Sequence, residues 1–150
     1  MFLRESGRKT TMRLRGKRIL VVEDDAKNMA IIAVILRQQG AIVFQDMWNS
    51  GTVGMIKDRM PIDAILLDLM LRGGRSGFDI VDEIKANLAL ADIPIIIVSA
   101  ADANVEMQKA RQKGCMGYIE KPINYAIKIV KKKSSRTSKA SRKHKEGIVI

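Results

Sequence analysis

The sequence predicts an α/β domain in which helices cover both faces of a five-stranded parallel sheet, a doubly wound arrangement. Short apolar runs alternate five times with longer segments that carry apolar residues at helical spacing. The first run, Arg18–Val22, is β-branched and bounded by charged residues, which is typical of a buried strand. The chain of 150 residues is long enough for one such domain and a short appendage.

Each strand is predicted from an apolar run, and each helix from apolar residues that recur every three or four positions. Stop signals support the helix ends, because Gly40 follows the first helix, Pro61 the second and Gly114 the fourth. The predicted strands are Arg18–Val22, Ala41–Gln45, Ala64–Leu67, Pro94–Val98 and Gly117–Ile119. The predicted helices are Asn28–Gln39, Ser50–Met60, about Phe78–Ala91, Asn104–Lys113 and a short last helix from near Asn124.

The net charge of +11 is concentrated at the two ends of the chain. Residues 1–18 carry +6 and residues 131–150 carry +7, whereas residues 19–130 carry −2. We therefore expect a basic N-terminal extension over 1–17, one domain over 18–130 and a basic, disordered tail over 131–150. The tail either only keeps the protein in solution or binds nucleic acid or an anionic membrane.

The chain has one cysteine, Cys115, and one histidine, His144. These counts exclude an intramolecular disulfide, a four-cysteine zinc site and any mechanism that needs two imidazoles. Every apolar run is too short to cross a bilayer, and the N-terminus is too polar for a secretory signal. We therefore expect a cytoplasmic protein without a transmembrane segment, whose candidate chemical groups are carboxylates.

Polar residues follow the predicted strands. In an open parallel sheet, ligands bind outside the carboxyl ends of the strands, so these residues are expected to converge. Clustered carboxylates repel one another unless a cation lies among them, and oxygen ligands suit Mg²⁺. Beside Mg²⁺ and a lysine, an aspartate can act as the nucleophile towards a phosphoryl group. The residues are Glu23, Asp24 and Asp25 after the first strand, Asp68 after the third, Ser99 after the fourth and Lys121 after the fifth.

Five segments resemble the motifs of response-regulator receiver domains, in the same order along the chain. The resemblance covers about residues 18–130 and implies a stand-alone, CheY-like receiver of two-component signalling, with the flavodoxin-like strand order 2-1-3-4-5. The segments are ILVVEDD at 19–25, DAILLDLML at 63–71, SGFDIV at 76–81, IPIIIVSA at 93–100 and GYIEKPI at 117–123.

The resemblance implies a magnesium site and a phosphoacceptor. Asp68 would accept the phosphoryl group. Glu23, Asp24, Asp68 and the backbone carbonyl of Met70 would hold Mg²⁺ as the cofactor.

Three further residues match positions that act on the phosphoryl group or respond to it. Lys121 would contact the phosphoryl group, and Ser99 and Tyr118 would form the switch. Tyr118 could instead only pack, half-exposed, on a short edge strand.

The chain departs from the family pattern at two places. Arg72 stands where a proline is common, and the loop Arg72–Gly77 is one residue longer than usual. We expect a more mobile loop with extra positive charge beside Asp68. The predicted last helix loses its apolar pattern after Val130, so the face often used for partner docking is expected to be short.

The resemblance implies that a histidine kinase or histidine phosphotransferase donates the phosphoryl group, and that phosphorylation switches the binding of a downstream effector protein. We expect no enzyme activity beyond phosphoryl transfer to the chain itself and autodephosphorylation. Two alternatives stay open. The protein could bind nucleic acid or an anionic surface through its basic tails, with the receiver as regulator, or it could be a metal-dependent phosphatase.

Overall fold

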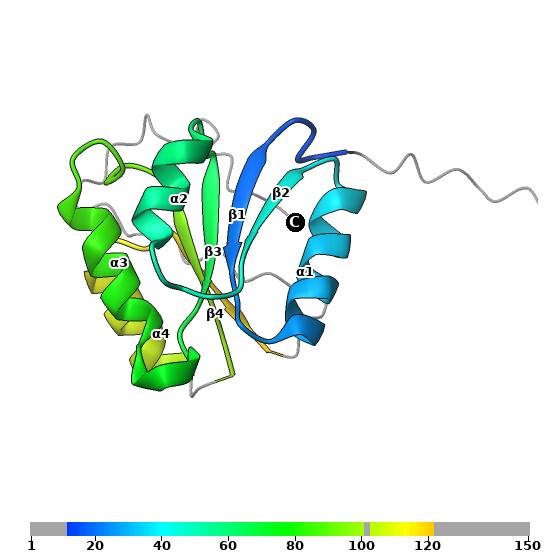
Figure 1. The fold of residues 1–150 in the computed structure, drawn as a ribbon. Helices are drawn as coiled ribbons and strands as arrows, with labels where there is room; N and C mark the ends of the chain where they lie inside the picture. Colours follow the sequence, from blue (N-terminus) through cyan, green and yellow to red (C-terminus); the bar gives the residue numbers. More distant parts are fainter. Residues whose placement is uncertain (1–11, 101–102, 122–150) are drawn as a thin grey trace, which may run out of the picture.

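The protein is built around a parallel sheet with the strand order β2-β1-β3-β4-β5 (Figure 1). The structure, a computed structural model, describes residues 12–100 and 103–121. All four neighbouring strand pairs are parallel, which confirms the predicted fold class. The strands are β1 (Arg18–Val22), β2 (Ile42–Asp46), β3 (Ala64–Asp68), β4 (Ile95–Ser99) and β5 (Gly117–Glu120). The α-helices are α1 (Ala26–Gln38), α2 (Thr52–Arg59), α3 (Gly77–Ala86) and α4 (Ala103–Gln112).

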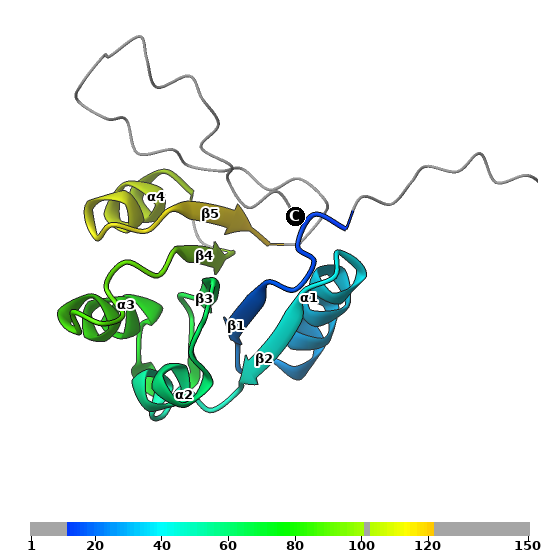
Figure 2. The ribbon, with the colours of Figure 1, turned by 90° about the horizontal axis from the view of Figure 1, so that it is seen from above.

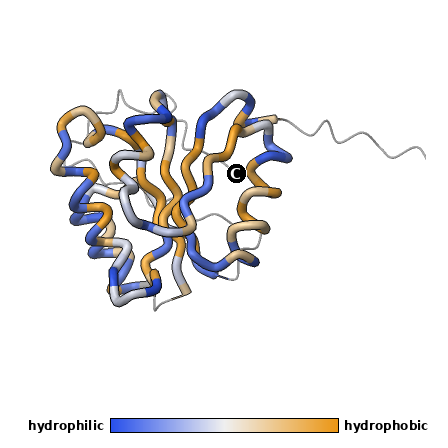
Figure 3. Tube along the Cα trace, viewed as in Figure 1, coloured by the Kyte–Doolittle hydropathy of each residue, from blue (hydrophilic) through white to orange (hydrophobic). Residues whose placement is uncertain are grey.

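Helices cover both faces of the sheet. Helix α1 lies on one face and α2, α3 and α4 lie on the other, as Figure 2 shows from above. In β1, Ile19 and Val21 pack in the cluster beneath α1, whereas Leu20 and Val22 pack in the cluster beneath α2, α3 and α4. Because successive side chains point to opposite faces, a strand covered on both sides is apolar at nearly every position. The strands accordingly form a hydrophobic band, and the helices beside it alternate between hydrophobic and hydrophilic residues (Figure 3).

Among the helix boundaries that differ from the sequence prediction, two depend on a side chain that binds the backbone. Helix α1 begins at Ala26 rather than Asn28, because Oδ1 of Asp25 accepts a hydrogen bond from the Asn28 N–H at 2.8 Å and caps the helix. The prediction that the third helix continues to about Ala91 is wrong. Helix α3 ends at Ala86, where Asn87 turns to extended backbone and its side chain accepts the Ala89 N–H at 3.1 Å.

Residues 12–17 pack against the domain, although the sequence analysis assigns them to an extension. Leu14 is 2% exposed and belongs to the hydrophobic cluster beneath α1. Its N–H donates to the Gln39 carbonyl at 2.9 Å, and the Gly16 N–H donates to the Gly40 carbonyl at 3.0 Å. These contacts attach the segment before β1 to the end of α1.

Several expectations concern residues outside those that the structure describes. They are the segment 1–11, the short helix from near Asn124 and the basic tail over 131–150. Among the residues described, no helix is both long enough and apolar enough to span a bilayer.

Candidate functional site

The carboxyl ends of four strands bring the predicted site residues to one edge of the sheet. The parallel register places Val22 beside Leu67, so Glu23 and Asp68 follow neighbouring strands. On the other side of β3, Asp68 lies beside Val98, the residue before Ser99. The Lys121 N–H then donates to the Ser99 carbonyl at 2.9 Å, which fixes the end of β5 against the end of β4. Tertiary pairing therefore assembles groups that are far apart in the sequence.

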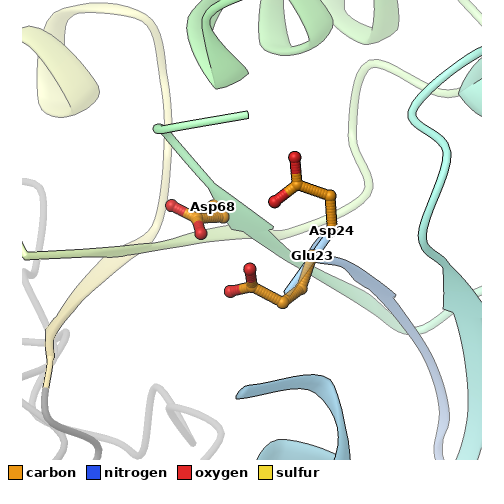
Figure 4. A group of neighbouring side chains, drawn as sticks. All are labelled: Glu23, Asp24 and Asp68. Carbon is orange, nitrogen blue, oxygen red and sulfur yellow. The ribbon is translucent and has the colours of Figure 1, made fainter. Parts of the chain in front are cut away.

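Three carboxylates meet at this edge and are called the acidic cluster below: Glu23, Asp24 and Asp68. Each offers a carboxylate oxygen, and these oxygens all lie within 4.8 Å of one another. Figure 4 shows the two acids that follow β1 beside the one that ends β3. Glu23 is 1% exposed and Asp68 is 3% exposed, whereas Asp24 is half-buried. Such a group of oxygens matches the predicted site and can hold a divalent cation.

Lys121 supplies a positive charge inside this cluster. Its ammonium nitrogen lies 2.6 Å from Oδ2 of Asp68 and 2.9 Å from Oε2 of Glu23. One ammonium thus pairs with two buried carboxylates while Asp24 lies beside them. With every group ionised, the acidic cluster and Lys121 together retain negative charge.

The surroundings shift two pKa values in the site. Burial, together with the neighbouring Asp68, raises the pKa of Glu23 from 4.5 to about 7, although the hydrogen bond from Lys121 opposes this. Burial lowers the pKa of Lys121, but its hydrogen bonds to Asp68 and Glu23 outweigh this, so the net shift is upward. Lys121 therefore stays charged at neutral pH, whereas Glu23 titrates close to neutral pH.

Backbone N–H groups orient all three carboxylates. The Met70 N–H donates to Oδ1 of Asp68 at 2.9 Å, and the Arg72 N–H donates to Oδ2 of Asp24 at 2.5 Å. The Asp25 N–H donates to Oε1 of Glu23 at 3.1 Å. These bonds cannot be foreseen from the sequence, because a backbone N–H carries no residue-specific signal. The contact predicted between the Met70 carbonyl and a metal stays a prediction.

Two other acids at this edge have structural roles. Asp25, which the sequence groups with its two neighbours, caps α1 and lies outside the acidic cluster. Asp46, which sequence analysis did not single out, ends β2, is buried and accepts hydrogen bonds from the Thr52 hydroxyl at 2.7 Å and the Asn49 N–H at 2.9 Å. The turn-forming residues after Asp46 were the available signal for this role.

The two predicted switch residues are both buried. Ser99 is 0% exposed at the end of β4. Tyr118, on β5, is 1% exposed and packs in the cluster beneath α2, α3 and α4, so it is not the half-exposed edge residue that the sequence allowed. Tyr118 pairs in register with Ile97, two residues before Ser99 on the neighbouring strand. Their predicted role as a switch stays a prediction.

Gly77 holds the start of α3 against the strand that carries Asp68. Its N–H donates to the Leu69 carbonyl at 2.9 Å. A Cβ at this position would lie only 2.2 Å from the Asp68 carbonyl oxygen and 2.9 Å from the Leu69 Cα. Since this contact is with backbone, a side chain here would push the end of β3 away, and glycine is required.

Known proteins share this sequence pattern. A family model described as the response regulator receiver domain matches residues 19–132. The chain is 32% identical over 109 residues to the phosphate regulon transcriptional regulatory protein PhoB of Escherichia coli, covering 73% of this chain and 47% of PhoB. It therefore spans about half the length of this relative. The polar-differentiation response regulator DivK of Brucella ovis is 29% identical over 108 residues, covering 72% of this chain and 86% of DivK.

Solved structures share the fold. The chemotaxis protein CheY4 of Vibrio cholerae has a TM-score of 0.66 to this chain at 18% identity, covering 73% of this chain and 89% of CheY4. Its likeness concerns the fold, whereas the match to the family model covers the strand ends and the acidic cluster. The chain belongs to the response regulator receiver domain family of two-component signalling.

Proposed function

We propose that this chain is the phosphoacceptor of a two-component phosphorelay, in which Asp68 takes a phosphoryl group from a phosphohistidine. A histidine kinase or a histidine phosphotransferase would supply that phosphohistidine. The observation that carries the proposal is the Lys121 ammonium, 2.6 Å from Oδ2 of Asp68 within the acidic cluster. A carboxylate beside a cation and further oxygen ligands is the arrangement that an acyl phosphate needs.

The donor set fits Mg²⁺, which accepts oxygen ligands and usually takes only one or two carboxylates directly. Glu23, Asp24 and Asp68 would hold it, together with the backbone carbonyl of Met70. Burial, and then the neighbouring Asp68, raise the pKa of Glu23, and a bound cation would favour its ionised form. When bound, the ion would neutralise charge on the carboxylates and on the incoming phosphoryl oxygens.

The transfer breaks the P–N bond to the donor imidazole and forms a P–O bond to a carboxylate oxygen of Asp68. The imidazole nitrogen keeps the electron pair of the broken bond and takes up a proton. Lys121, already beside Oδ2 of Asp68, pairs with the phosphoryl oxygens as they arrive. Water would later cleave the acyl phosphate at the same site, so the only reactions that we propose take place on the chain's own Asp68.

Phosphorylation would then change a partner-binding surface. The new group adds roughly −1.5 to −2 charge at one point. Ser99 lies at the same sheet edge and can donate its hydroxyl to a phosphoryl oxygen. A shift of Ser99 along β4 would reach Tyr118 on β5, which packs in one cluster with Ala110 of α4. We propose that the surface of α4 and β5 responds in this way and binds the downstream effector.

Labelling with a small phosphodonor tests the acceptor. The purified chain is incubated with acetyl phosphate and Mg²⁺, and the bound phosphate is measured by intact mass. The unmodified chain should gain one phosphoryl group, and Asp68→Asn should gain none. Asp92→Asn, which alters an exposed carboxylate in the turn after α3, is the matched control and should be labelled like the unmodified chain. Equal labelling of Asp68→Asn would reject the acceptor.

A second candidate function is binding of nucleic acid through the basic ends. The net charge of +7 over residues 131–150 favours it, whereas residues 19–130 carry −2. Affinity for duplex DNA should then fall steeply with salt, and deleting residues 131–150 should remove most of that salt dependence. Binding that is equally weak at low and high salt would exclude this function.

The cytoplasmic location expected from the sequence stays a prediction.

A further inference from the structure

The backbone N–H of Arg72 binds a predicted metal ligand. Arg72 opens a short turn, Arg72–Gly74, in the loop between β3 and α3, in which Gly73 has a left-handed φ of 80°. Its N–H donates to Oδ2 of Asp24 at 2.5 Å, across 48 positions of sequence. Of the three acids, Asp24 is the most exposed, so this bond anchors the carboxylate that has the most freedom to turn away.

This hydrogen bond is compatible with metal binding. While it is made, Asp24 still offers an oxygen within 4.8 Å of oxygens from Glu23 and Asp68. A carboxylate can accept an N–H on one oxygen and bind a cation through the other. A hydrogen bond to the ionised form favours that form and fixes its orientation, as partners of metal ligands commonly do.

The loop that carries the Arg72 N–H is also attached to the fold on its far side. The Arg75 guanidinium donates to the Asn49 carbonyl at 3.1 Å and pairs with Glu83 on α3. Ser76 caps α3, with its hydroxyl accepting the Phe78 N–H at 3.2 Å. The loop predicted to be more mobile is therefore hydrogen-bonded to two other parts of the fold.

We infer that the Arg72 backbone N–H is a positioning group for the magnesium site, holding Asp24 in the orientation in which it shares a cation with Glu23 and Asp68. The inference rests on the proposed function only in that the acidic cluster binds Mg²⁺. It assigns the effect to the amide and not to the guanidinium. The Arg72 side chain is exposed and adds positive charge near the cluster, which disfavours a cation.

Substitution of Arg72 by proline or by alanine separates the effect of its backbone N–H from the effect of its guanidinium. Proline removes the N–H, and the local backbone suits it. Leu71 has φ −96° and ψ 150°, the extended conformation that a residue before proline prefers. Arg72 has no positive φ, and the glycine after it has φ 80° and ψ 17°, the values of the glycine that follows proline in a type II turn. Arg72→Ala, in contrast, keeps the N–H and removes only the guanidinium.

Calorimetric titration of Mg²⁺ into the full chain compares these variants, at a pH well above 7 so that Glu23 is ionised. Arg72→Pro should weaken Mg²⁺ binding roughly 10-fold or more, the usual effect of losing a partner of a metal ligand. Arg72→Ala should bind Mg²⁺ at least as tightly as the unmodified chain. The metal-free unfolding midpoint of each variant, measured in chelator, shows that the proline variant is folded.

The outcomes separate this inference from the proposed function. If Arg72→Pro binds Mg²⁺ as well as the unmodified chain, or if alanine weakens binding as much as proline, the positioning role is wrong while the magnesium site stands. If the unmodified chain does not bind Mg²⁺, both are wrong. A measurement on the unmodified chain avoids the question of folding. The Arg72 amide resonance should move with the same midpoint as Mg²⁺ binding, and an unmoved resonance overturns the inference.

Discussion

The ammonium of Lys121 and the buried carboxylate of Asp68 form a partly buried ion pair, with 2.6 Å between Nζ and Oδ2. The same nitrogen lies 2.9 Å from Oε2 of Glu23. Lys121 is therefore the partner expected for a phosphoryl group. Before phosphorylation, its positive charge offsets part of the negative charge of the carboxylates. Two buried carboxylates depend on one side chain at the end of β5.

Removing this side chain should destabilise the metal-free protein. Lys121→Met keeps the aliphatic stem but leaves Glu23 and Asp68 without their cation, and such losses cost roughly 3–5 kcal/mol. Urea unfolding in chelator at neutral pH measures the change, and Mg²⁺ should restore part of the stability. Lys27→Met, on the exposed side of α1, is the control and should change stability little. An unchanged midpoint for Lys121→Met would show that the pair contributes nothing.

Stability in the absence of metal should depend on pH through Glu23. Its pKa rises from 4.5 to about 7 on folding because the carboxyl group is buried beside Asp68. The folded state thus binds this proton more tightly than the unfolded state, so this contribution to stability is largest at low pH. It should fall as pH rises from 4.5 to about 7 and then level off.

Denaturant unfolding at a series of pH values, in chelator, checks this dependence. The comparison variant is Glu23→Gln, which resembles the protonated form and should lose this part of the slope. Mg²⁺ binding needs the ionised carboxylate, so Mg²⁺ affinity of the unmodified chain should rise over the same pH range. Identical slopes for the two proteins would contradict the prediction.

Gly77→Ala should disturb the phosphoacceptor through the backbone. The new Cβ would lie 2.2 Å from the Asp68 carbonyl oxygen, so β3 or α3 must move. Overpacking of this kind costs roughly 1–3 kcal/mol. We expect lower stability and slower labelling by acetyl phosphate. Gly54→Ala, in α2 with nothing within 4 Å of its Cβ, is the control and should stabilise by about 0.5–1 kcal/mol. Equal effects of the two alanines would refute the argument.

Leu14→Ala should show that the segment before β1 belongs to the folded core. Leu14 is buried in the cluster beneath α1, and truncating such a side chain costs roughly 2–5 kcal/mol. Met12→Ala, at an exposed position in the same segment, should change the free energy of unfolding by less than about 0.5 kcal/mol. Thermal or urea unfolding of the two variants distinguishes them. If Leu14→Ala lowers the free energy of unfolding only slightly, the segment before β1 adds little to the stability of the core.

Local sequence patterns predicted the sheet and most of its elements. Strands covered on both faces are apolar throughout, and helix ends carry glycine or proline, so periodicity and stop signals located them. Helix α3 was predicted too long, because the break at Asn87 depends on a side chain that competes for the backbone. The place of Leu14 was missed because a single apolar residue in a basic segment has no periodicity.

The sequence by itself determined which chemical groups follow each strand, and the strand-end rule for parallel sheets was enough to expect Glu23, Asp68 and Lys121 together. Only the tertiary structure decided which of three consecutive acids face one another, since Asp25 caps α1 while Asp24 joins the cluster. It alone revealed the Arg72 amide on Asp24. Side-chain type is written in the sequence, whereas a hydrogen bond from the main chain depends on where the folded backbone passes.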